Sequence, residues 1–172
     1  TALVLNSGAI RDLAGNDADL TFATVADDGT LKVDTTVPAI NSLTVSGTDS
    51  SGAAKTGPLS VGDKIKVVIN TSEAVIITGS PTVSISVGSN ARTATYVSGS
   101  GTAALVFTYD IQSGDTAASN MVSTTTTPLT LSGGATVTDP AGNMLTNSVA
   151  SVATIGSATS VDTAGVPTAR VT

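Results

Sequence analysis

The chain has 172 residues, of which 40% are hydrophobic and 12% are charged, and its net charge is −6. It contains no Cys and no His, which excludes disulfides, thiolate metal sites and a Ser-His-Asp triad, so we expect no enzyme. The seven Lys and Arg are spread along the sequence rather than gathered in a basic footprint, and no apolar run of about 18 residues occurs, so we expect neither nucleic-acid binding nor membrane insertion.

The N-terminal segment returns later in the chain. Residues 3–16 (LVLNSGAIRDLAGN) match residues 129–143 (LTLSGGATVTDPAGN) with one insertion, and VDTTVP at 33–38 matches VDTAGVP at 161–167. The offset is 127 residues from Asp12 to Asp139 and 128 from Asp34 to Asp162, about the length of one β-sandwich domain. We therefore predict that residues 1–34 are the C-terminal strands of a preceding repeat. Residues 35–161 would be a complete domain, and residues 162–172 a linker that begins the next repeat.

Several segments of the complete domain alternate between polar and apolar residues with a period of two, as half-buried strands do. These are residues 42–46, 64–70, 82–87 and 105–111, and a later strand is expected to begin at Leu129. Glycine and proline turn signals lie between them, and the apolar residues are mostly small or branched, which suits packed sheets. The sequence predicts an all-β fold, an immunoglobulin-like Greek-key β-sandwich of the repeat type. A closed barrel is the alternative all-β architecture.

Aspartate and asparagine side chains gather at the two matching turns. Hard Ca²⁺ takes six to eight oxygen ligands, and such ligands are offered by Asp12, Asn16, Asp17 and Asp19, with Asp34 from the junction, and in a second copy by Asp139, Asn143 and Asp162. The other interpretation is a turn in which Asp12 or Asp139 accepts hydrogen bonds from nearby backbone amides. Both interpretations are open at this point, and calcium is the one cofactor that the sequence suggests.

The quoted turn belongs to a wider resemblance. Residues 70–115 (NTSEAVIITGSPTVSISVGSNARTATYVSGSGTAALVFTYDIQSGD), followed by residues 131–143, closely resemble the bacterial immunoglobulin-like repeats of giant surface proteins, which include large adhesins, RTX-type secreted proteins and surface-layer proteins. The resemblance implies a β-sandwich that acts as a spacer or stalk, often stiffened by calcium. Family members often carry further acidic residues after the position of Asp115, where this chain has TAASN.

Three functions follow as hypotheses. The first is a non-catalytic stalk domain of an extracellular, adhesin-like protein on a bacterial surface, whose partners are the neighbouring repeats. The alternative is a self-assembling surface-layer or filament subunit that exchanges strands with other copies of itself, because an exposed strand edge is a template for pairing. The third is carbohydrate or protein binding through Tyr96 or Tyr109, the only tyrosines.

Overall fold

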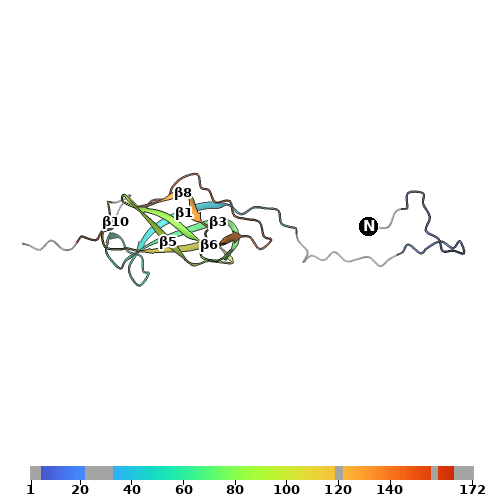
Figure 1. Cartoon of the computed structure of the whole chain (residues 1–172), viewed down its shortest axis with the longest axis horizontal. Coiled ribbons are helices and arrows are strands. Elements are labelled where there is room, and N and C mark those ends of the chain that lie inside the picture. Colours follow the sequence, from blue (N-terminus) through green and yellow to red (C-terminus); the bar gives the residue numbers. More distant parts are fainter. Residues whose placement is uncertain (1–4, 22–32, 119–121, 156–158, 165–172) are drawn as a thin grey trace, which may run out of the picture. The chain divides into compact units, whose positions relative to one another are not determined.

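The computed structural model describes residues 5–21, 33–118, 122–155 and 159–164. The chain divides into two compact units, residues 1–33 (unit 1) and residues 34–172 (unit 2), which are shown in Figure 1. Among the described residues, unit 1 has an isolated bridge between Arg11 and Asp17, and the strands all belong to unit 2. Most of the predicted linker at 162–172, and residues 1–4 and 22–32 of the predicted first segment, lie outside the described residues.

Unit 2 is built entirely of strands and turns in its described part, which confirms the all-β prediction. One antiparallel sheet has the order β1-β3-β6-β5-β4-β8, with β9 paired to the far end of β3, and a small sheet has the order β2-β10-β7. The strands are β1 (Ile40–Thr48), β2 (Gly57–Leu59), β3 (Lys64–Thr78), β4 (Thr82–Val87), β5 (Asn90–Ser98), β6 (Thr102–Asp110), β7 (Thr116–Ala117), β8 (Val122–Thr130), β9 (Thr136–Thr138) and β10 (Thr159–Asp162).

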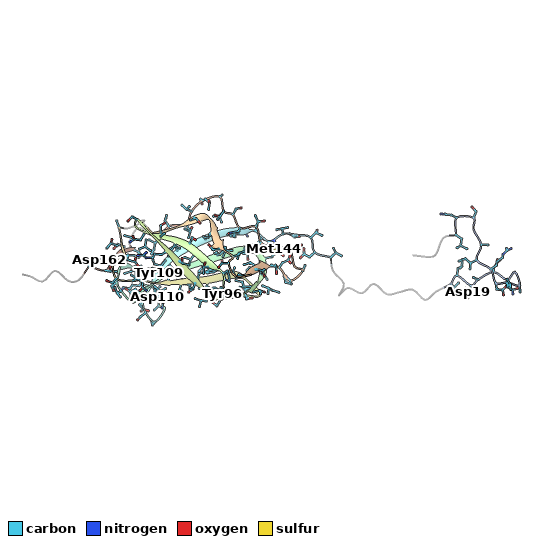
Figure 2. All side chains as sticks on the ribbon, in the orientation of Figure 1. Asp19, Tyr96, Tyr109, Asp110, Met144 and Asp162 are labelled. Carbon is cyan, nitrogen blue, oxygen red and sulfur yellow. The ribbon has the colours of Figure 1, made fainter. Side chains whose placement is uncertain are left out.

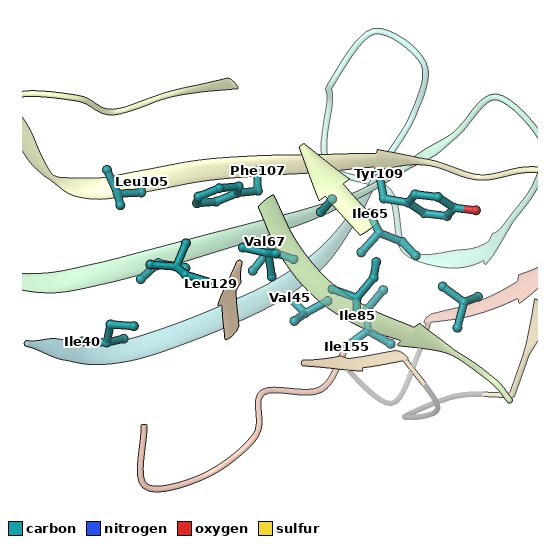
Figure 3. Close-up of a cluster of buried hydrophobic side chains, with 14 of the residues drawn as sticks. Ile40, Val45, Ile65, Val67, Ile85, Leu105, Phe107, Tyr109, Leu129 and Ile155 are labelled. Atoms are coloured by element: carbon teal, nitrogen blue, oxygen red, sulfur yellow. The ribbon is translucent and has the colours of Figure 1, made fainter. Parts of the chain in front are cut away.

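The core lies on the inner face of the curled main sheet, where the alternating residues point (Figure 3). Ile65, Val67 and Ile69 of β3 are fully buried, whereas Lys64 and Lys66 between them are partly exposed. The face predicted for residues 105–111 is buried in the same way, with Phe107 at its centre. The period-two pattern therefore predicted the buried face of these two strands correctly, because successive side chains of a strand point to opposite faces.

Two strands differ from the prediction. Leu129 lies near the C-terminal end of β8, not at the start of a strand, because the strand begins at Val122 and contains the run of four threonines at 124–127. β5, which forms a hairpin with β4, also has many polar residues. Threonine is β-branched and suits a pleated surface, but it gives no apolar alternation for a pattern to detect.

The main sheet curls until its first and last strands approach one another. The irregular residues 146–155 lie between them, where the Val149 amide donates to the Thr126 carbonyl (2.9 Å) and Val45 bridges Ile155 in parallel. Ile155 is only 1% exposed, so this segment also closes the core. The architecture is sandwich-like, with a curled antiparallel main sheet and a small mixed sheet.

The chain passes through unit 2 from one end to the other. The residues that precede β1 lie at the end opposite β10 (Figure 1), and Met144 and Asp162 likewise lie at opposite ends (Figure 2). β10 is held in the small sheet by parallel pairing with β2 and antiparallel pairing with β7. The first and last described segments of unit 2 are thus anchored at two separate places.

Candidate metal site at the N-terminal end of unit 2

The turn that follows β9 is held together by one buried carboxylate. Asp139, which is 1% exposed, accepts hydrogen bonds from the Asn143 amide (2.8 Å) and from Asn143 Nδ2 (2.7 Å). The Gly142 amide donates to the Asp139 carbonyl (3.2 Å), and Gly142 has a φ of 97°, which glycine adopts without steric cost. The sequence D-P-A-G-N therefore forms the capped turn that was one of the two interpretations of this motif.

The segment that leads into β1 is fastened to this turn. Asn143 Nδ2 also donates to the Asp34 carbonyl (3.1 Å), and the Thr146 amide donates to the Pro38 carbonyl (2.8 Å). Ala39 exchanges two hydrogen bonds with Ser72 of β3, at 3.0 Å and 2.8 Å. Residues 34–39 are thereby held between the turn and the middle of β3.

β3 changes partners at the point where it meets this segment. Its register with β6 shifts between Asn70 and Val75, after which Ile76–Thr78 pairs with β9. Thr71 Oγ1 donates to the Glu73 carbonyl (2.6 Å) inside this irregular stretch. The irregular stretch carries Glu73, the only glutamate of the chain, and its side chain is half-buried.

These three elements bring together three carboxylates, which we call the acidic trio. One carboxylate oxygen each of Asp34, Glu73 and Asp139 lies within 4.8 Å of the others. Within the described ranges, no other group of three or more acidic residues comes together in this way. Two of its members, Asp34 and Asp139, were predicted as ligands from the sequence, and Asn143 lies beside them.

The electrostatics of the trio favour a cation. Burial, together with the charges of Asp34 and Asp139, raises the pKa of Glu73 above its ordinary value. Burial also acts to raise the pKa of Asp139, but hydrogen bonds from Asn143 and the turn amides outweigh it and keep that pKa low. In the part of the chain that the structure describes, the ion pairs all lie elsewhere: Arg11–Asp17, Lys55–Asp63, Lys64–Asp110 and Arg92–Asp115.

The donor chemistry of the trio suits a hard divalent cation, a class that includes calcium. All its side-chain donors are carboxylate oxygens, which hard divalent cations prefer, and it contains neither the imidazole nor the thiolate ligands that select zinc or copper. Asn143 uses its amide nitrogen to join Asp139 to the Asp34 backbone, so it orients the site. A bound Ca²⁺ would supply the positive charge that offsets the repulsion among the three carboxylates.

The predicted ligands in unit 1 are engaged in other contacts. Asp12 accepts from the Asn16 amide and from Asn16 Nδ2, both at 2.8 Å, in the same turn that Asp139 forms. Asp17 pairs with Arg11 at 2.6 Å, and Asp19 accepts from the Thr21 amide at 2.9 Å. Asp17 thus forms an ion pair with the side chain of Arg11, and Asp19 caps its own turn.

The last predicted ligand, Asp162, lies away from the trio. It belongs to β10 and pairs with Thr116 of β7. Its Oδ1 accepts from the Ala164 amide at 2.9 Å, and Asp34 Oδ1 accepts from the Thr36 amide at the same distance. The two VDT segments thus form the same local turn, but only Asp34 reaches the other acidic residues.

Sequence reasoning missed Glu73 as a candidate ligand. Acidic residues that lie close together in turns indicate a calcium site in a sequence. Glu73 gives no such signal, because it lies in a strand 39 positions after Asp34 and 66 before Asp139. One signal was present, because the alternation of β3 breaks at Ser72–Glu73–Ala74, where a charged residue interrupts an otherwise apolar face. Such a break commonly marks a β-bulge, and bulges re-aim side chains.

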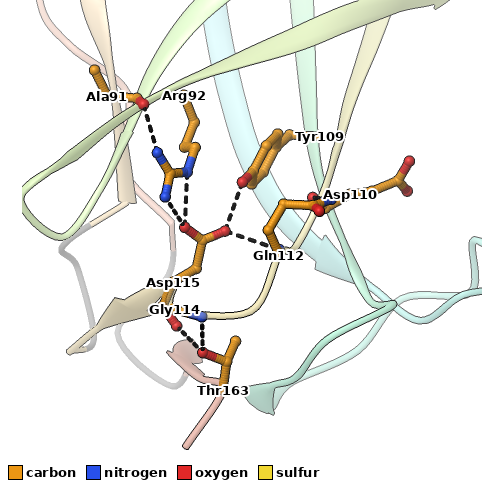
Figure 4. Close-up of polar contacts among 8 residues, drawn as sticks. All are labelled: Ala91, Arg92, Tyr109, Asp110, Gln112, Gly114, Asp115 and Thr163. Atoms are coloured by element: carbon orange, nitrogen blue, oxygen red, sulfur yellow. Dashed lines mark hydrogen bonds and ion pairs between the residues drawn. The ribbon is translucent and has the colours of Figure 1, made fainter.

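A second polar cluster lies near the C-terminal end of unit 2 (Figure 4). Asp115 is fully buried and accepts from Arg92 Nε (2.8 Å), Tyr109 Oη (2.6 Å) and the Gln112 amide (3.0 Å). Thr163 Oγ1 donates to the Asp115 carbonyl (2.8 Å), which fastens the chain just after β10. These hydrogen bonds satisfy a buried carboxylate, so the loop after Gly114 is closed by protein groups.

The two tyrosines do not form a ring platform for a sugar. Tyr109 is buried against the core and donates to Asp115. Tyr96 is partly buried and packs edge-on against Phe107, with ring centroids 5.6 Å apart. Its hydroxyl accepts from the Ser100 amide at 2.8 Å. Both rings therefore serve packing and hairpin geometry.

Comparison with known proteins gives no match: no family model, no curated protein and no solved structure is significantly similar to this chain. A search of the described residues for a helix of sufficient length and apolarity to cross a membrane finds none.

Proposed function

We propose that this chain is a non-catalytic structural segment of a tandem immunoglobulin-like stalk, and that calcium at the acidic trio fixes the junction before each domain. The observation that carries the proposal is that the segment preceding β1 and strand β10 lie at opposite ends of unit 2 (Figure 1). Domains with this arrangement join end to end into an extended rod. Such a rod holds a distal module away from the surface to which it is attached.

The strand order supports the immunoglobulin-like part of this proposal. An immunoglobulin sandwich has strands A, B, E and D in one sheet and C, F and G in the other. The order β1-β3-β6-β5 corresponds to A-B-E-D, and the neighbours β4 and β8 correspond to C and F. Residues 146–155 lie beside β8 as strand G lies beside F. Strands β4, β5 and β6 follow one another through hairpins, and β3, which precedes them in the chain, lies beside β6. This arrangement of four strands also agrees with a Greek key.

The position of the trio supports a role in stiffening the junction. Asp34 lies in the segment that precedes β1, whereas Glu73 and Asp139 belong to the body of unit 2. A cation bound to all three joins this segment to the domain and limits its motion. We propose an extracellular location for the chain, where calcium modules work at about 10⁻⁴–10⁻³ M Ca²⁺.

The side-chain inventory supports a non-catalytic role. General acid–base and nucleophilic catalysis most often use His, or a nucleophile activated by a neighbouring base, and this chain has neither His nor Cys. The three buried carboxylates of the described residues are occupied in structural contacts: Asp63 with Lys55, Asp115 with Arg92 and Tyr109, and Asp139 with Asn143.

The proposal is tested by thermal unfolding with and without Ca²⁺. At a hundredfold excess of Ca²⁺ over its dissociation constant, we expect the midpoint to rise by roughly 5–10 °C, because the ligand binds the folded state alone. The Glu73→Gln variant keeps the size of the side chain and removes one ligand charge, so we expect little or no rise. An equal rise in both proteins would show that the calcium effect comes from elsewhere.

One observation favours the alternative, a self-assembling subunit. Unit 1 exposes apolar side chains, with Leu13 fully exposed and Ile10 50% exposed, and exposed apolar groups promote association. Light scattering at rising protein concentration distinguishes the two functions. A stalk segment stays monomeric with and without Ca²⁺, whereas a subunit of a layer or filament forms larger species.

A further inference from the structure

We infer that residues 5–18 are a second copy of the edge element formed by residues 132–145, and that they bind the β3-type strand of another domain built like unit 2. The inference rests on the tandem organisation proposed above and names the surface through which unit 1 meets its partner. Unit 2 provides the bound form of this element, and unit 1 shows the same element without that strand.

The two segments share their backbone hydrogen bonds at an offset of 127 residues. The Gly8 amide donates to the Leu5 carbonyl (2.6 Å), as the Ala135 amide donates to the Ser132 carbonyl (3.1 Å). The Ala18 amide donates to the Ile10 carbonyl (2.8 Å), as the Leu145 amide donates to the Val137 carbonyl (2.9 Å). In the turn itself, the amides of Asp12 and Asp139 donate to the carbonyls of Asn16 and Asn143, both at 3.0 Å. The bridges Arg11–Asp17 and Thr138–Met144 correspond as well.

The two segments also share an unusual backbone conformation. Gly133 and Gly134 have φ values of 62° and 79°, and the matching residues Asn6 and Ser7 have φ values of 40° and 69°. Glycine adopts this left-handed region freely, whereas other residues do so at a cost. Residues 5–18 therefore take the shape of residues 132–145 although their own sequence favours it less.

The two segments differ in how deeply their apolar side chains are buried. Val137 is fully buried and Leu145 is 8% exposed, because β9 pairs with β3 and both side chains pack into the core. The matching Ile10 is 50% exposed, and Ala18 is exposed as well. Residues 5–18 thus have the shape of an edge element. The side chain of Ile10, which matches the buried Val137, is exposed and available for a partner.

Unit 2 defines what this partner must offer. Val137 pairs with Ile77, and its neighbours pair with Ile76 and Thr78, so a partner strand places an Ile77-like residue opposite Ile10. In that complex Asp12 takes the position of Asp139. The partner must then carry acidic residues at the positions of Asp34 and Glu73, since these complete the trio in unit 2.

A segment exchange in the full chain tests whether residues 5–18 fit a β3 edge. In the test variant, residues 132–144 are replaced by a copy of residues 5–17, which keeps Leu145 in the core. In the control variant, the same 13 residues are inserted in scrambled order. We expect the test variant to unfold in one cooperative transition, with a midpoint lowered by less than roughly 10 °C, because most of the exchanged side chains are exposed.

The scrambled variant is expected to lose the β3–β9 pairing, which hydrogen exchange at the amides of residues 76–78 detects. The inference is overturned if the test variant behaves like the scrambled one in both midpoint and amide protection. Calcium binding by the unchanged chain is a separate measurement. If the unchanged chain binds no calcium, the metal part of the proposed function is wrong. If only the segment exchange fails, the inferred partner surface of residues 5–18 is wrong.

Discussion

The two polar clusters of unit 2 use the same kind of carboxylate in opposite ways. Near the C-terminal end, Asp115 is buried with Arg92 and Tyr109, which neutralise its charge and satisfy its oxygens. At the N-terminal end, Asp139 is just as deeply buried, but its neighbours Asp34 and Glu73 are also acidic. The Asp115 cluster contains the cation that offsets its buried charge, whereas the acidic trio gathers three carboxylates whose mutual repulsion the proposed calcium ion would offset.

The largest expected effect comes from opening the closed cluster. Asp115→Ala leaves the Tyr109 hydroxyl and the Arg92 guanidinium without their acceptor, and we expect a loss of about 3 kcal/mol of unfolding free energy, measured by urea denaturation. The matched control is Asp110→Ala, which breaks the exposed pair with Lys64 and should cost about 0–1 kcal/mol. Equal losses in the two variants would contradict the structural role of Asp115.

A smaller effect is expected from removing only the phenolic donor. Burial and the hydrogen bond to Asp115 raise the pKa of Tyr109 from its ordinary 10.0 to about 12. Because the folded state favours the protonated tyrosine, this contribution is fully present below pH 10 and is lost as the pH rises through about 12. Tyr109→Phe should cost about 1–2 kcal/mol at neutral pH and should flatten the loss of stability between these two pH values.

The measurement is the urea midpoint of both proteins across that range, together with the absorbance of ionised tyrosine. If the parent and the Phe variant lose stability in parallel above pH 10, the alkaline transition arises from another group.

In the acidic trio, removing a charge should stabilise the protein once calcium is removed by a chelator. Because the pKa of Glu73 is raised in the folded state, the contribution of this group is fully present below its unfolded value of 4.5 and is lost as the pH rises through the higher folded value. At neutral pH the charged Glu73 is therefore destabilising. We expect Glu73→Gln to raise the chelated midpoint by roughly 1–4 °C.

Calcium is expected to reverse the effect of Glu73→Gln on the midpoint of unfolding, which makes the prediction specific. The same variant should be more stable than the parent with chelator and less stable with saturating Ca²⁺. A variant that is less stable in both conditions would indicate that Glu73 has a structural role unrelated to repulsion.

The smallest effect is expected at Asp162, which matches Asp34 in the repeat but lies at the end of unit 2 opposite Met144 (Figure 2), whose neighbour Asn143 is hydrogen-bonded to Asp34. Asp162→Asn should leave the calcium-induced rise in midpoint unchanged within error, whereas Asp34→Asn should reduce it. A reduction by Asp162→Asn as large as that by Asp34→Asn would mean that the two VDT segments act alike.

Sequence patterns predicted the buried faces of β3 and β6 and offered the aspartate-capped turn as one of two interpretations, because both features are local. Alternation indicates which residues of β3 and β6 face the core, and D-x-A-G-N closes its own turn through Asp139 and Asn143. The site was predicted only in part. Asp34 and Asp139 are placed together by contacts that span more than 100 residues, and Glu73 joins them through an irregularity in β3.

The closed cluster was not predictable for the same reason. Arg92, Tyr109 and Asp115 come from β5, β6 and the loop before β7, and their meeting depends on how the sheet curls. The sequence-based prediction of Asp17, Asp19 and Asp162 as ligands stays untested by any measurement, and their present contacts give them other roles.

Isothermal titration of the full chain with Ca²⁺, beside the Glu73→Gln variant, tests the central claim most directly. The account predicts one Ca²⁺ per chain with a dissociation constant of about 10⁻³ M or tighter, and binding that is lost or strongly weakened in the variant. Absence of binding in the unchanged chain, or the same binding in both proteins, would contradict it.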